Sequence, residues 1–498
     1  LEWTLSHDVV CWLGADAPAD TGIKSAVADD EVVVLARAPL DPPIRDVFAK
    51  QAAVTYVLAH NRTLDAALAR VRSRFTEARE DESSDLSRLK ELAEEAPVID
   101  LVNGVLEEAL TRRASDVHVE PFEREFQIRL RIDGVLHTIQ TLPRARYDAV
   151  ASRIKLLSGM DIAERRLPQD GRQSIRFAGI ELDLRVSSLP GSWGESLVLR
   201  LLRKQQSLPS LEGLGLAGRS MSAFQTLIQE KNGVVLVTGP TGSGKSTTLY
   251  RGLELVNDGE RKLITIEDPV EYDMAGVTQV QAHPEIGYTF ARGLRAILRQ
   301  DPDVIMIGEM RDGETASIGV QAALTGHLVF STLHTNSALA AVDRLADLGI
   351  ERFLIAASLR GLMGQRLVRR LCAHCSRPAP GSVSAENDRR YDHARADGAP
   401  LPDTNPNERV WREAVGCREC AGTGYSGRIA LFEIATVREA LHDAIVNRAS
   451  DRELFAAARS SGFSTMYEDG LLKAAEGLTT VSEVLRVVGA SNAEPERA

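Results

Sequence analysis

The chain has 498 residues, of which 44% are hydrophobic and 26% charged, and its formal net charge is −11. This length is too great for one hydrophobic core and predicts three or four domains of ordinary globular composition. The acidic balance, without a long run of Lys and Arg, disfavours nucleic acid as the main partner. No apolar stretch approaches the length of a membrane span, and the first residues lack the pattern of a secretory signal, so a cytoplasmic protein is expected.

The first part of the chain has the pattern of two small α/β domains. Residues 1–75 mix short apolar runs with helical patterning and predict an N-terminal domain without a motif that names a chemistry. Residues 76–96 are rich in Arg, Glu, Asp and Ser, as in a linker or an exposed helix. Residues 97–206 combine an apolar helical stripe with later period-two alternation and predict a second α/β domain. Residues 207–215 contain Pro and Gly breaks and predict a linker.

A third domain is expected over residues 216–370. Apolar strands alternate there with helical segments, which is typical of a parallel sheet covered by helices on both faces. The strands are expected at Val234–Thr238, Leu263–Glu267, Val304–Ile307 and Leu328–Thr332. Residues 371–433 are expected to form a cysteine-containing subdomain whose polar stretch Ser376–Arg409 is a loop, and residues 434–498 are expected to be helical.

The strongest motif lies between the first of these strands and a helix. Residues 239–246 fit the pattern GxxxxGK[ST] of a phosphate-binding P-loop. The glycines let successive backbone N–H groups turn toward an anion, Lys245 reaches the β- and γ-phosphates, and the Ser246 hydroxyl binds Mg²⁺. The residues predicted to bind ATP are Gly239, Pro240, Thr241, Gly242, Ser243, Gly244, Lys245, Ser246 and Thr247.

Acidic residues end two further strands. Glu267 and Asp268 close the strand that begins at Leu263, with Glu271 shortly after, and Glu309 follows the strand Val304–Ile307. The carboxyl ends of strands in an open α/β sheet face the nucleotide crevice, where such acids hold Mg²⁺ or polarise the attacking water. Asp268 is predicted to bind Mg²⁺ together with Ser246. His327 and His334 flank a further strand, where a histidine can sense the γ-phosphate.

Four of the five cysteines form two CxxC pairs, whereas Cys11 stands alone. The pairs are Cys372 with Cys375 and Cys417 with Cys420. Four thiolates in two knuckles suit a tetrahedral Zn²⁺ site of structural type, because four protein ligands leave no open position for a substrate. The interval between the pairs is longer than in common zinc ribbons, and His374 is an alternative ligand.

At this point the motifs resemble a known family, the assembly ATPases of bacterial type II secretion systems. Residues 239–250, 264–271, 298–311 and 325–336 resemble the Walker A, aspartate, Walker B and histidine boxes of secretion ATPases. Residues 115–121 and 166–172 resemble the domain that precedes the nucleotide-binding core in that family. The resemblance spans residues 97–435, whereas the N-terminal domain matches poorly and Ile180 stands where the family often has Arg.

The resemblance implies an α/β protein with a RecA-like P-loop core, a preceding PAS-like domain, a zinc-binding insertion, a helical C-terminus and a homo-hexameric ring. It implies that Arg185 and Arg200 contact the phosphates and that Arg295 and Arg299 act across the subunit interface. It assigns water activation to Glu271 and Glu309, of which Glu309 is the first choice. The alternating polar residues Asp116, His118 and Glu120 are interpreted as a polar strand face, because the family has no metal there.

The function implied by the resemblance is hydrolysis of ATP to power pseudopilus assembly and protein export at the cytoplasmic face of the bacterial inner membrane. The N-terminal domain is expected to bind the cytoplasmic domain of a membrane-anchoring component, and the ring to act on an inner-membrane platform protein. Three alternatives remain: a type IV pilus extension ATPase, a DNA-uptake or conjugation translocase, and a scaffold that does not hydrolyse ATP. The acidic charge argues against the translocase, and intact Lys245, Glu271 and Glu309 argue against the scaffold.

Overall fold

The computed structural model describes residues 88–177, 180–203 and 208–489, together with short segments between residues 9 and 69. The chain divides into two compact units, Leu1–Leu202 and Arg203–Ala498. Residues 76–87 of the expected linker lie outside the described residues, whereas residues 88–94 are helical. None of the helices in the described part is both long and apolar enough to cross a bilayer.

The segments near the N-terminus contain a small sheet in the order β1-β2-β3, in which β2 is antiparallel to β1 and parallel to β3. The strands are β1 Val9–Leu13, β2 Val32–Ala36 and β3 Val54–Leu58. Successive residues of β2 are buried on opposite faces, since Leu35 packs with Leu64 and Leu68 whereas Val34 packs with Ile44. Both faces are therefore covered, as in an α/β domain.

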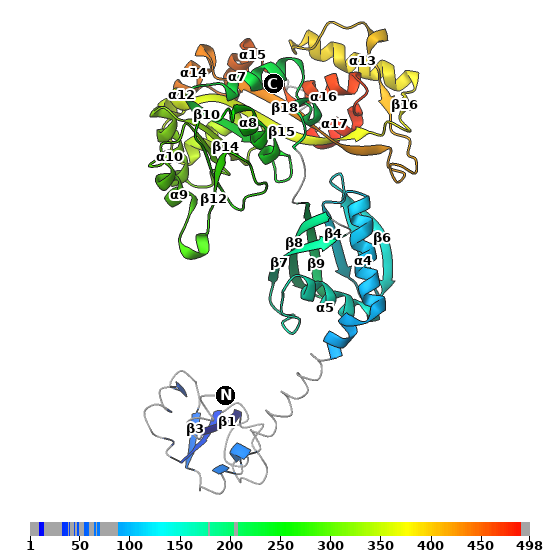
Figure 1. The fold of residues 1–498 in the computed structure, drawn as a ribbon, viewed down its shortest axis with the longest axis vertical. Coiled ribbons are helices and arrows are strands. Elements are labelled where there is room, and N and C mark those ends of the chain that lie inside the picture. Colours follow the sequence, from blue (N-terminus) through cyan, green and yellow to red (C-terminus); the bar gives the residue numbers. More distant parts are fainter. Residues whose placement is uncertain are drawn as a thin grey trace. The chain divides into compact units, whose positions relative to one another are not determined.

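A six-stranded sheet in the order β6-β5-β4-β9-β8-β7 follows, and Figure 1 shows it with α4 and α5. Its strands are β4 Asp116–Pro121, β5 Glu125–Ile132, β6 Val135–Pro143, β7 Gln169–Phe177, β8 Ile180–Gly191 and β9 Gly194–Arg203. Its helices are α4 Ala96–Thr111, the 3₁₀ turn η3 Arg144–Arg146 and α5 Tyr147–Leu157. The sequence pattern did not indicate β6 and α5.

One face of this sheet holds the hydrophobic core. Pro97 lies in the first turn of α4, where the missing proline N–H costs no helical hydrogen bond. Val98, Val102 and Val105 then recur at helical spacing and are buried in one cluster with Leu184 and Leu199 of the sheet. Because strand side chains alternate, the residues directly next to these leucines along β8 and β9 point to the other face.

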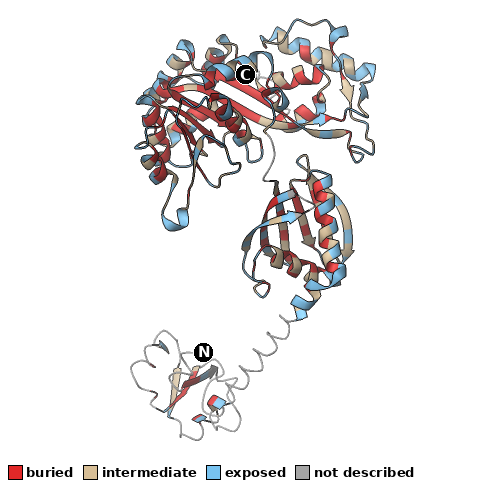
Figure 2. Cartoon of the chain, viewed as in Figure 1, coloured by how far each residue is buried: buried red, intermediate tan, exposed pale blue. Residues whose placement is uncertain are grey.

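The second unit is built on a seven-stranded sheet in the order β12-β11-β13-β14-β10-β15-β18. Neighbouring strands of this sheet are parallel, except that β15 and β18 are antiparallel. The strands are β10 Gly233–Thr238, β11 Leu263–Glu267, β12 Val277–Gln281, β13 Val304–Ile307, β14 Leu328–Leu333, β15 Leu359–Leu371 and β18 Tyr425–Thr436. Every residue of β10 and β14 is buried, as Figure 2 shows for the centre of this unit.

Helices cover both faces of this sheet, which confirms the expected P-loop NTPase architecture. Ile305 and Ile307 of β13 belong to one core cluster, whereas Val304 and Met306 belong to the cluster on the opposite face. The helices of this part are α6 Leu211–Leu214, α7 Gly218–Ile228, α8 Lys245–Val256, the 3₁₀ turn η4 Pro284–Ile286, α9 Phe290–Ile297, α10 Gly313–Leu324, α11 Ala340–Asp347 and α12 Arg352–Ser358. The short helix α6 falls within the expected linker.

The segment Ser376–Arg409 is not a loop, contrary to the expectation from its polar composition. It contains the helix α13, in which Tyr391 is fully buried and packs edge-on against Trp411 with ring centroids 6.4 Å apart. Arg409 lies 4.2 Å above the same tyrosine ring. The elements are β16 Arg377–Pro378, α13 Gly381–Ala396, η5 Pro406–Glu408 and β17 Arg412–Glu413. Few apolar residues suffice because Trp411 completes the contact from outside the segment.

The C-terminal part is helical, as expected. Its helices are α14 Glu439–Val446, α15 Asp451–Ser460, α16 Met466–Ala475 and α17 Val481–Val488. Leu471 of α16 and Val484 of α17 are buried in one cluster with Leu431 of β18 and Tyr391 of α13. The C-terminal helices therefore connect the central sheet with the segment between the cysteine pairs. The boundary expected at residue 433 falls inside β18.

Candidate functional site

The P-loop connects the carboxyl end of β10 with the amino end of α8, as its motif requires. Helix α8 begins at Lys245, and no side chain caps its first turn. Its first N–H groups therefore remain available to an anion at the positive end of the helix. Lys245 is 8% exposed, and its ammonium group donates to the carbonyl oxygens of Gly239 at 2.9 Å and Pro240 at 3.0 Å. The lysine side chain thus folds back onto the P-loop, whose backbone would surround a bound phosphate.

Two glycines of the loop have no room for a side chain. Gly239 has φ +144°, and a Cβ atom there would lie 2.4 Å from the carbonyl oxygen of Gln365. Gly244 has φ +88°, and its Cβ atom would lie 2.8 Å from Nε2 of the same glutamine. Gln365 is fully buried on β15 and its Oε1 accepts a hydrogen bond of 2.9 Å from Thr248 of α8. The loop therefore rests on β15, and glycine is required at the contact.

Glu309 lies beside the P-loop lysine at the carboxyl edge of the sheet. It follows β13 and forms an ion pair with Arg311, while its Oε2 lies 3.5 Å from Nε2 of His334. Burial lowers the pKa of Lys245, and the negative charge of Glu309 opposes this shift. The Glu309 hydrogen bond raises the pKa of Arg311, and the charge of Asp268 contributes to the same shift. These charges act on one another, so the strand-end groups form one cluster.

The three acids that close β11 have different environments. The side chain of Glu267 is buried, and Tyr250 and Thr265 donate hydrogen bonds to it. Asp268 and Glu271 are exposed in the loop that follows. Glu267 therefore points into the protein, whereas Asp268 and Glu271 are accessible to a ligand.

The two histidines that flank β14 lie at opposite edges of the sheet. β10 and β14 are parallel, with Gly233 opposite Leu328 and Thr238 opposite Leu333. His334 therefore lies at the P-loop edge, whereas His327 precedes β14 at the amino edge, where its Nδ1 lies 2.8 Å from the Ala322 carbonyl oxygen. The expectation that His327 senses a γ-phosphate does not fit its place relative to the P-loop of the same chain, because a strand's ends cannot share an edge.

In the other unit, Arg185 and Arg200 lie on the sheet face opposite the helices. Arg200 of β9 donates a hydrogen bond of 3.0 Å from Nε to the buried Asp116, and Arg185 of β8 lies 3.6 Å from Asp183. Figure 1 labels the strands that carry them. The Arg200 side chain is 56% exposed although its partner carboxylate is buried. This face therefore presents two guanidinium groups, each beside a buried carboxylate.

The two acids of β4 on this face pair with arginines. Glu120 forms an ion pair with Arg129, and Asp116 lies between Arg200 and Arg131. Among the described residues, His118 and these acids do not form a metal-type cluster.

Arg295 and Arg299 lie on the surface of the second unit. Arg295 of α9 donates a hydrogen bond of 2.6 Å to Glu314, and Arg299 donates one of 2.8 Å to the Arg295 carbonyl oxygen. Both residues are exposed. Among the described residues, neither arginine forms a hydrogen bond with Lys245 or Glu309.

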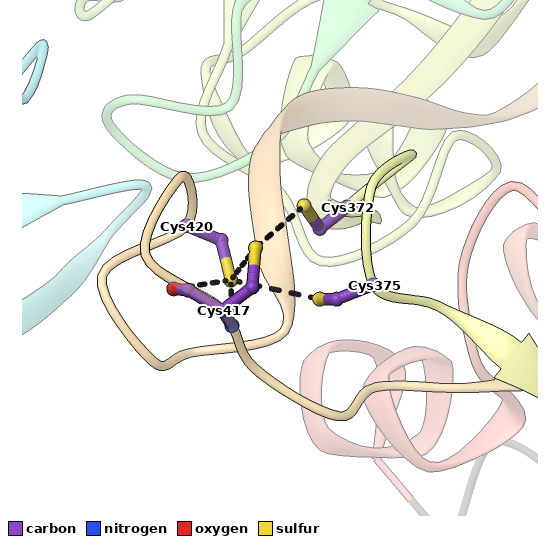
Figure 3. A group of neighbouring side chains, drawn as sticks. All are labelled: Cys372, Cys375, Cys417 and Cys420. Carbon is purple, nitrogen blue, oxygen red and sulfur yellow. Dashed lines mark hydrogen bonds between the residues drawn. The ribbon is translucent and has the colours of Figure 1, made fainter.

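The four paired cysteines converge, as Figure 3 shows, with Cys372 and Cys375 facing Cys417 and Cys420. All four Sγ atoms lie within 4.8 Å of one another. Three sulfur pairs are separated by 3.9, 3.7 and 3.7 Å. Tetrahedral ligation at Zn–S distances of about 2.3 Å requires sulfur separations of about 3.8 Å. The donor set therefore fits Zn²⁺, and it does not include His374.

Backbone donors surround these sulfurs. The N–H groups of Cys417 and Gly424 donate to Cys420 Sγ at 3.1 and 3.2 Å, and that of Gly416 to Cys375 Sγ at 3.3 Å. Burial raises the pKa of Cys420, but hydrogen bonds from the Cys417 and Gly424 backbone and from the Cys417 and Cys375 thiols together lower it. Such N–H···S contacts stabilise thiolates, the form that binds a metal.

Comparison with known proteins assigns the chain to a family. Residues 91–486 match the family model described as Type II/IV secretion system protein. The chain belongs to this family. Type II secretion system protein E of Pseudomonas aeruginosa is 43% identical to this secretion-family protein over 93% of this chain and 90% of its own length. Type II secretion system ATPase E of Vibrio cholerae is 46% identical, over 80% of this chain and 77% of its own length.

Other relatives of this secretion-family protein come from related machines. Type IV pilus assembly ATPase PilB of Myxococcus xanthus is 45% identical, over 84% of this chain and 72% of its own length. Among solved structures, the pilus retraction motor PilT with bound ADP matches with a TM-score of 0.50, 25% identity and coverage of 80% of this chain and 97% of its own. The Legionella pneumophila ATPase DotB, with a TM-score of 0.54, 23% identity and coverage of 77% and 94%, supports the fold alone.

Sequence reasoning did not assign three residues at the site of this secretion-family protein. Arg311 pairs with Glu309, and its only signal was its place two residues later in the same motif. Gln365 supports the P-loop from β15, more than a hundred residues away along the chain, so no local pattern indicates it. The Tyr250 hydroxyl of α8 donates a hydrogen bond to Glu267 in the core. An aromatic residue at helical spacing in the sequence indicates only a packed core position, so this role was not predicted.

Proposed function

We propose that this secretion-family protein hydrolyses ATP to ADP and phosphate and uses the energy to drive assembly of a type II secretion pseudopilus and protein export. The observation that carries the proposal is the P-loop lysine Lys245 at the uncapped start of α8, together with Glu309, which is paired with Arg311 and lies 3.5 Å from His334 at the end of β13. A lysine and free helix N–H groups suit the phosphates of ATP, and a carboxylate beside them suits the water. The names of the Pectobacterium, Pseudomonas and Vibrio relatives support the type II assignment.

In the proposed reaction, Glu309 orients a water molecule toward the γ-phosphate and accepts its proton, with Glu271 as the second acid. The water oxygen forms a bond to phosphorus while the bond to the β–γ bridging oxygen breaks, and ADP takes the electron pair. Lys245 offsets the charge on the phosphates. Arg311 contacts Oε1 of Glu309 and His334 lies near Oε2, and together they orient the carboxylate.

The residues present fit Mg²⁺, which takes oxygen ligands. The exposed Ser246 hydroxyl lies in the first turn of α8, and the Asp268 carboxylate is exposed at the same edge of the sheet. We propose that these two residues hold the ion, which when bound offsets phosphate charge.

The proposal extends to the assembly. A homo-hexameric ring would bring Arg295 and Arg299 to a neighbouring subunit, and the polar face with Arg185 and Arg200 would close on the phosphates. The N-terminal domain would bind the cytoplasmic domain of a membrane-anchoring component, which places the ring at the inner membrane beside a platform protein. The identity of 45% to the pilus assembly ATPase of Myxococcus xanthus favours pilus extension as the second candidate function.

Release of phosphate from ATP tests the proposed reaction. Wild-type protein should show Mg²⁺-dependent ATPase activity that Lys245→Ala abolishes. Glu309→Gln should still bind ATP but turn over at least about 100-fold more slowly, as expected for loss of a water-orienting group. Near-wild-type phosphate release from Glu309→Gln would contradict the assignment of Glu309. ATPase stimulation by DNA rather than by the anchoring component would favour the translocase alternative.

A further inference from the structure

The loop that follows β11 is fixed by side chains from two neighbouring elements. Residues 268–276 connect β11 with β12 and carry Asp268 and Glu271. The Glu271 N–H donates to the Tyr250 hydroxyl oxygen at 3.2 Å. Near the end of the loop, Asn257 Nδ2 donates to the Ala275 carbonyl oxygen at 2.8 Å. Tyr250 and Asn257 belong to α8 and its C-terminal cap, so the loop is tied to the P-loop helix.

The third anchor comes from β12. Gln279 Nε2 donates to the Tyr272 carbonyl oxygen at 2.8 Å, and its Oε1 accepts from the Met274 N–H at 2.7 Å. The same amide nitrogen lies 3.3 Å from Oε1 of Glu267, within hydrogen-bond distance. The glutamine therefore bonds both the loop backbone and the buried acid at the end of β11.

Glu267 joins these anchors below the loop. Its carboxylate accepts hydrogen bonds from Tyr250, from Gln279 and, at 2.5 Å, from Thr265. Tyr250 is fully buried and Glu267 is 4% exposed. Tyr272 of the loop packs edge-on against Tyr250, with ring centroids 5.5 Å apart. The Tyr250 hydroxyl thus donates to a fixed carboxylate and accepts from the Glu271 backbone.

We infer that Tyr250 is a positioning residue that holds Glu271 in register with the P-loop, through a buried network with Glu267 and Gln279. The inference rests on the proposed function, because Glu271 matters to it as an acid near the attacking water. An unsupported loop would let the exposed Glu271 carboxylate sample many positions, whereas three anchors restrict its backbone. Since α8 also carries Lys245, a phosphate on the P-loop and the acid on the loop share one rigid support.

The test uses Tyr250→Phe in the full chain, which removes the hydroxyl and keeps the ring. We expect kcat to fall about 10-fold while KM stays within about 2-fold, because the hydroxyl affects orientation rather than ATP binding. In a Glu271→Gln background, Tyr250→Phe should cause no further loss, since it acts through Glu271. Gln279→Met removes the amide that bonds the loop from β12. It should likewise lower kcat in the wild-type background and cause no further loss in the Glu271→Gln background.

Tyr391→Phe is the matched control, because Tyr391 is equally buried and donates its hydroxyl to the Pro402 carbonyl oxygen at 3.2 Å, in the segment between the cysteine pairs. It should leave kcat unchanged in both backgrounds. Equal losses from Tyr250→Phe in the wild-type and Glu271→Gln backgrounds would overturn the inference while leaving the proposed ATPase intact. Wild-type turnover of Glu271→Gln would also overturn it, whereas Glu309→Gln decides the ATPase assignment separately.

Amide exchange provides a readout independent of activity. In Tyr250→Phe the Glu271 N–H loses its acceptor, so its hydrogen–deuterium exchange should accelerate more than about 10-fold relative to wild type. The Ala282 N–H, which donates to the Glu267 carbonyl oxygen at 2.8 Å on the β12 side, should exchange at the wild-type rate. An unchanged rate at Glu271 would overturn the inference even if the protein hydrolysed no ATP.

Discussion

Arg185 and Arg200 each lie beside a buried carboxylate on the polar face of the six-stranded sheet. Asp116 is buried and accepts a hydrogen bond from Arg200 Nε, whereas the outer guanidinium nitrogens have no hydrogen bond to any of the described residues and can bond a further anion. Arg185 Nε lies 3.6 Å from the Asp183 carboxylate, close enough for an ion pair but not for a hydrogen bond. A guanidinium that is already oriented loses less freedom when it meets a phosphate, and this favours a role in the transition state over a role in initial binding.

We therefore expect Arg185→Ala and Arg200→Ala each to lower kcat by about 10-fold or more, with ATP affinity changed by less than about 3-fold. Arg129→Ala is the control, because Arg129 lies on the same sheet face, pairs with Glu120 and has no proposed phosphate contact. Single-turnover hydrolysis and equilibrium binding of ATP separate the two quantities. Normal hydrolysis by both arginine variants would mean that they are surface residues.

At the residue scale, the sequence predicts groups that bind ligands better than groups that position them. The P-loop glycines and Lys245 follow from a contiguous motif because a phosphate cradle is built from consecutive backbone N–H groups. Tyr250, Gln365 and Arg311 act through partners that only the folded chain brings near. The two histidines around β14 show the same limit, since strand direction decides which one reaches the P-loop edge.

Among the elements, β18 carries a buried acid that connects three segments. Glu433 Oε1 accepts the Ala338 N–H at 2.5 Å and Oε2 accepts the Met466 N–H of α16 at 3.4 Å. Gly364 of β15 leaves room for this carboxyl group, because a Cβ atom there would lie 2.6 Å from Glu433 Oε1. Burial raises the pKa of Glu433 to about 7, although both backbone hydrogen bonds oppose the shift.

This raised pKa predicts a pH dependence of stability. An unfolded glutamate titrates at about pH 4.3, so between that value and about pH 7 the folded state holds a proton that the unfolded state has lost. Glu433 therefore lowers stability progressively as the pH rises through this window. Glutamine at this position does not titrate, so Glu433→Gln should not lose stability in this way. The amount by which its Tm exceeds that of the wild type should therefore grow by several degrees between pH 5 and pH 8. Thermal unfolding of both proteins measures this, and a difference independent of pH would contradict it.

The contact between Tyr391 of α13 and Trp411 involves none of the four cysteines, so loss of zinc should affect the cysteine knuckles and not α13. We expect one Zn²⁺ per chain by mass spectrometry, and Cys417→Ser should lose it, since structural zinc contributes on the order of 10 kcal/mol to folding. New proteolytic sites should appear in residues 413–424. α13 should stay protected because Tyr391 packs on Trp411 without the metal. Metal-free wild-type protein with unchanged protease resistance would leave these cysteines as ordinary thiols.

At the scale of the whole molecule, the order of strands and helices in the P-loop core was predictable from alternating buried strands and helical segments. The pairing of β15 with β18 was not, because 53 residues separate their facing ends and carry no apolar pattern. The helix α13 was also missed, since its polar sequence gains stability from residues outside it, among them Trp411, Arg409 and Leu471. Local periodicity predicts elements, whereas contacts distant in the sequence decide which of them become ordered.

The antiparallel pairing of β15 with β18 also sets an order of events during synthesis. The parallel part of the sheet is complete when Leu371 has left the ribosome, but β15 then lies at the edge with unpaired backbone groups and apolar residues such as Leu362 and Met363. Only after residues 425–436 emerge does β18 cover that edge. A nascent chain that stalls between the cysteine pairs would expose a 13-residue strand to other chains, the condition under which incomplete proteins aggregate or recruit chaperones.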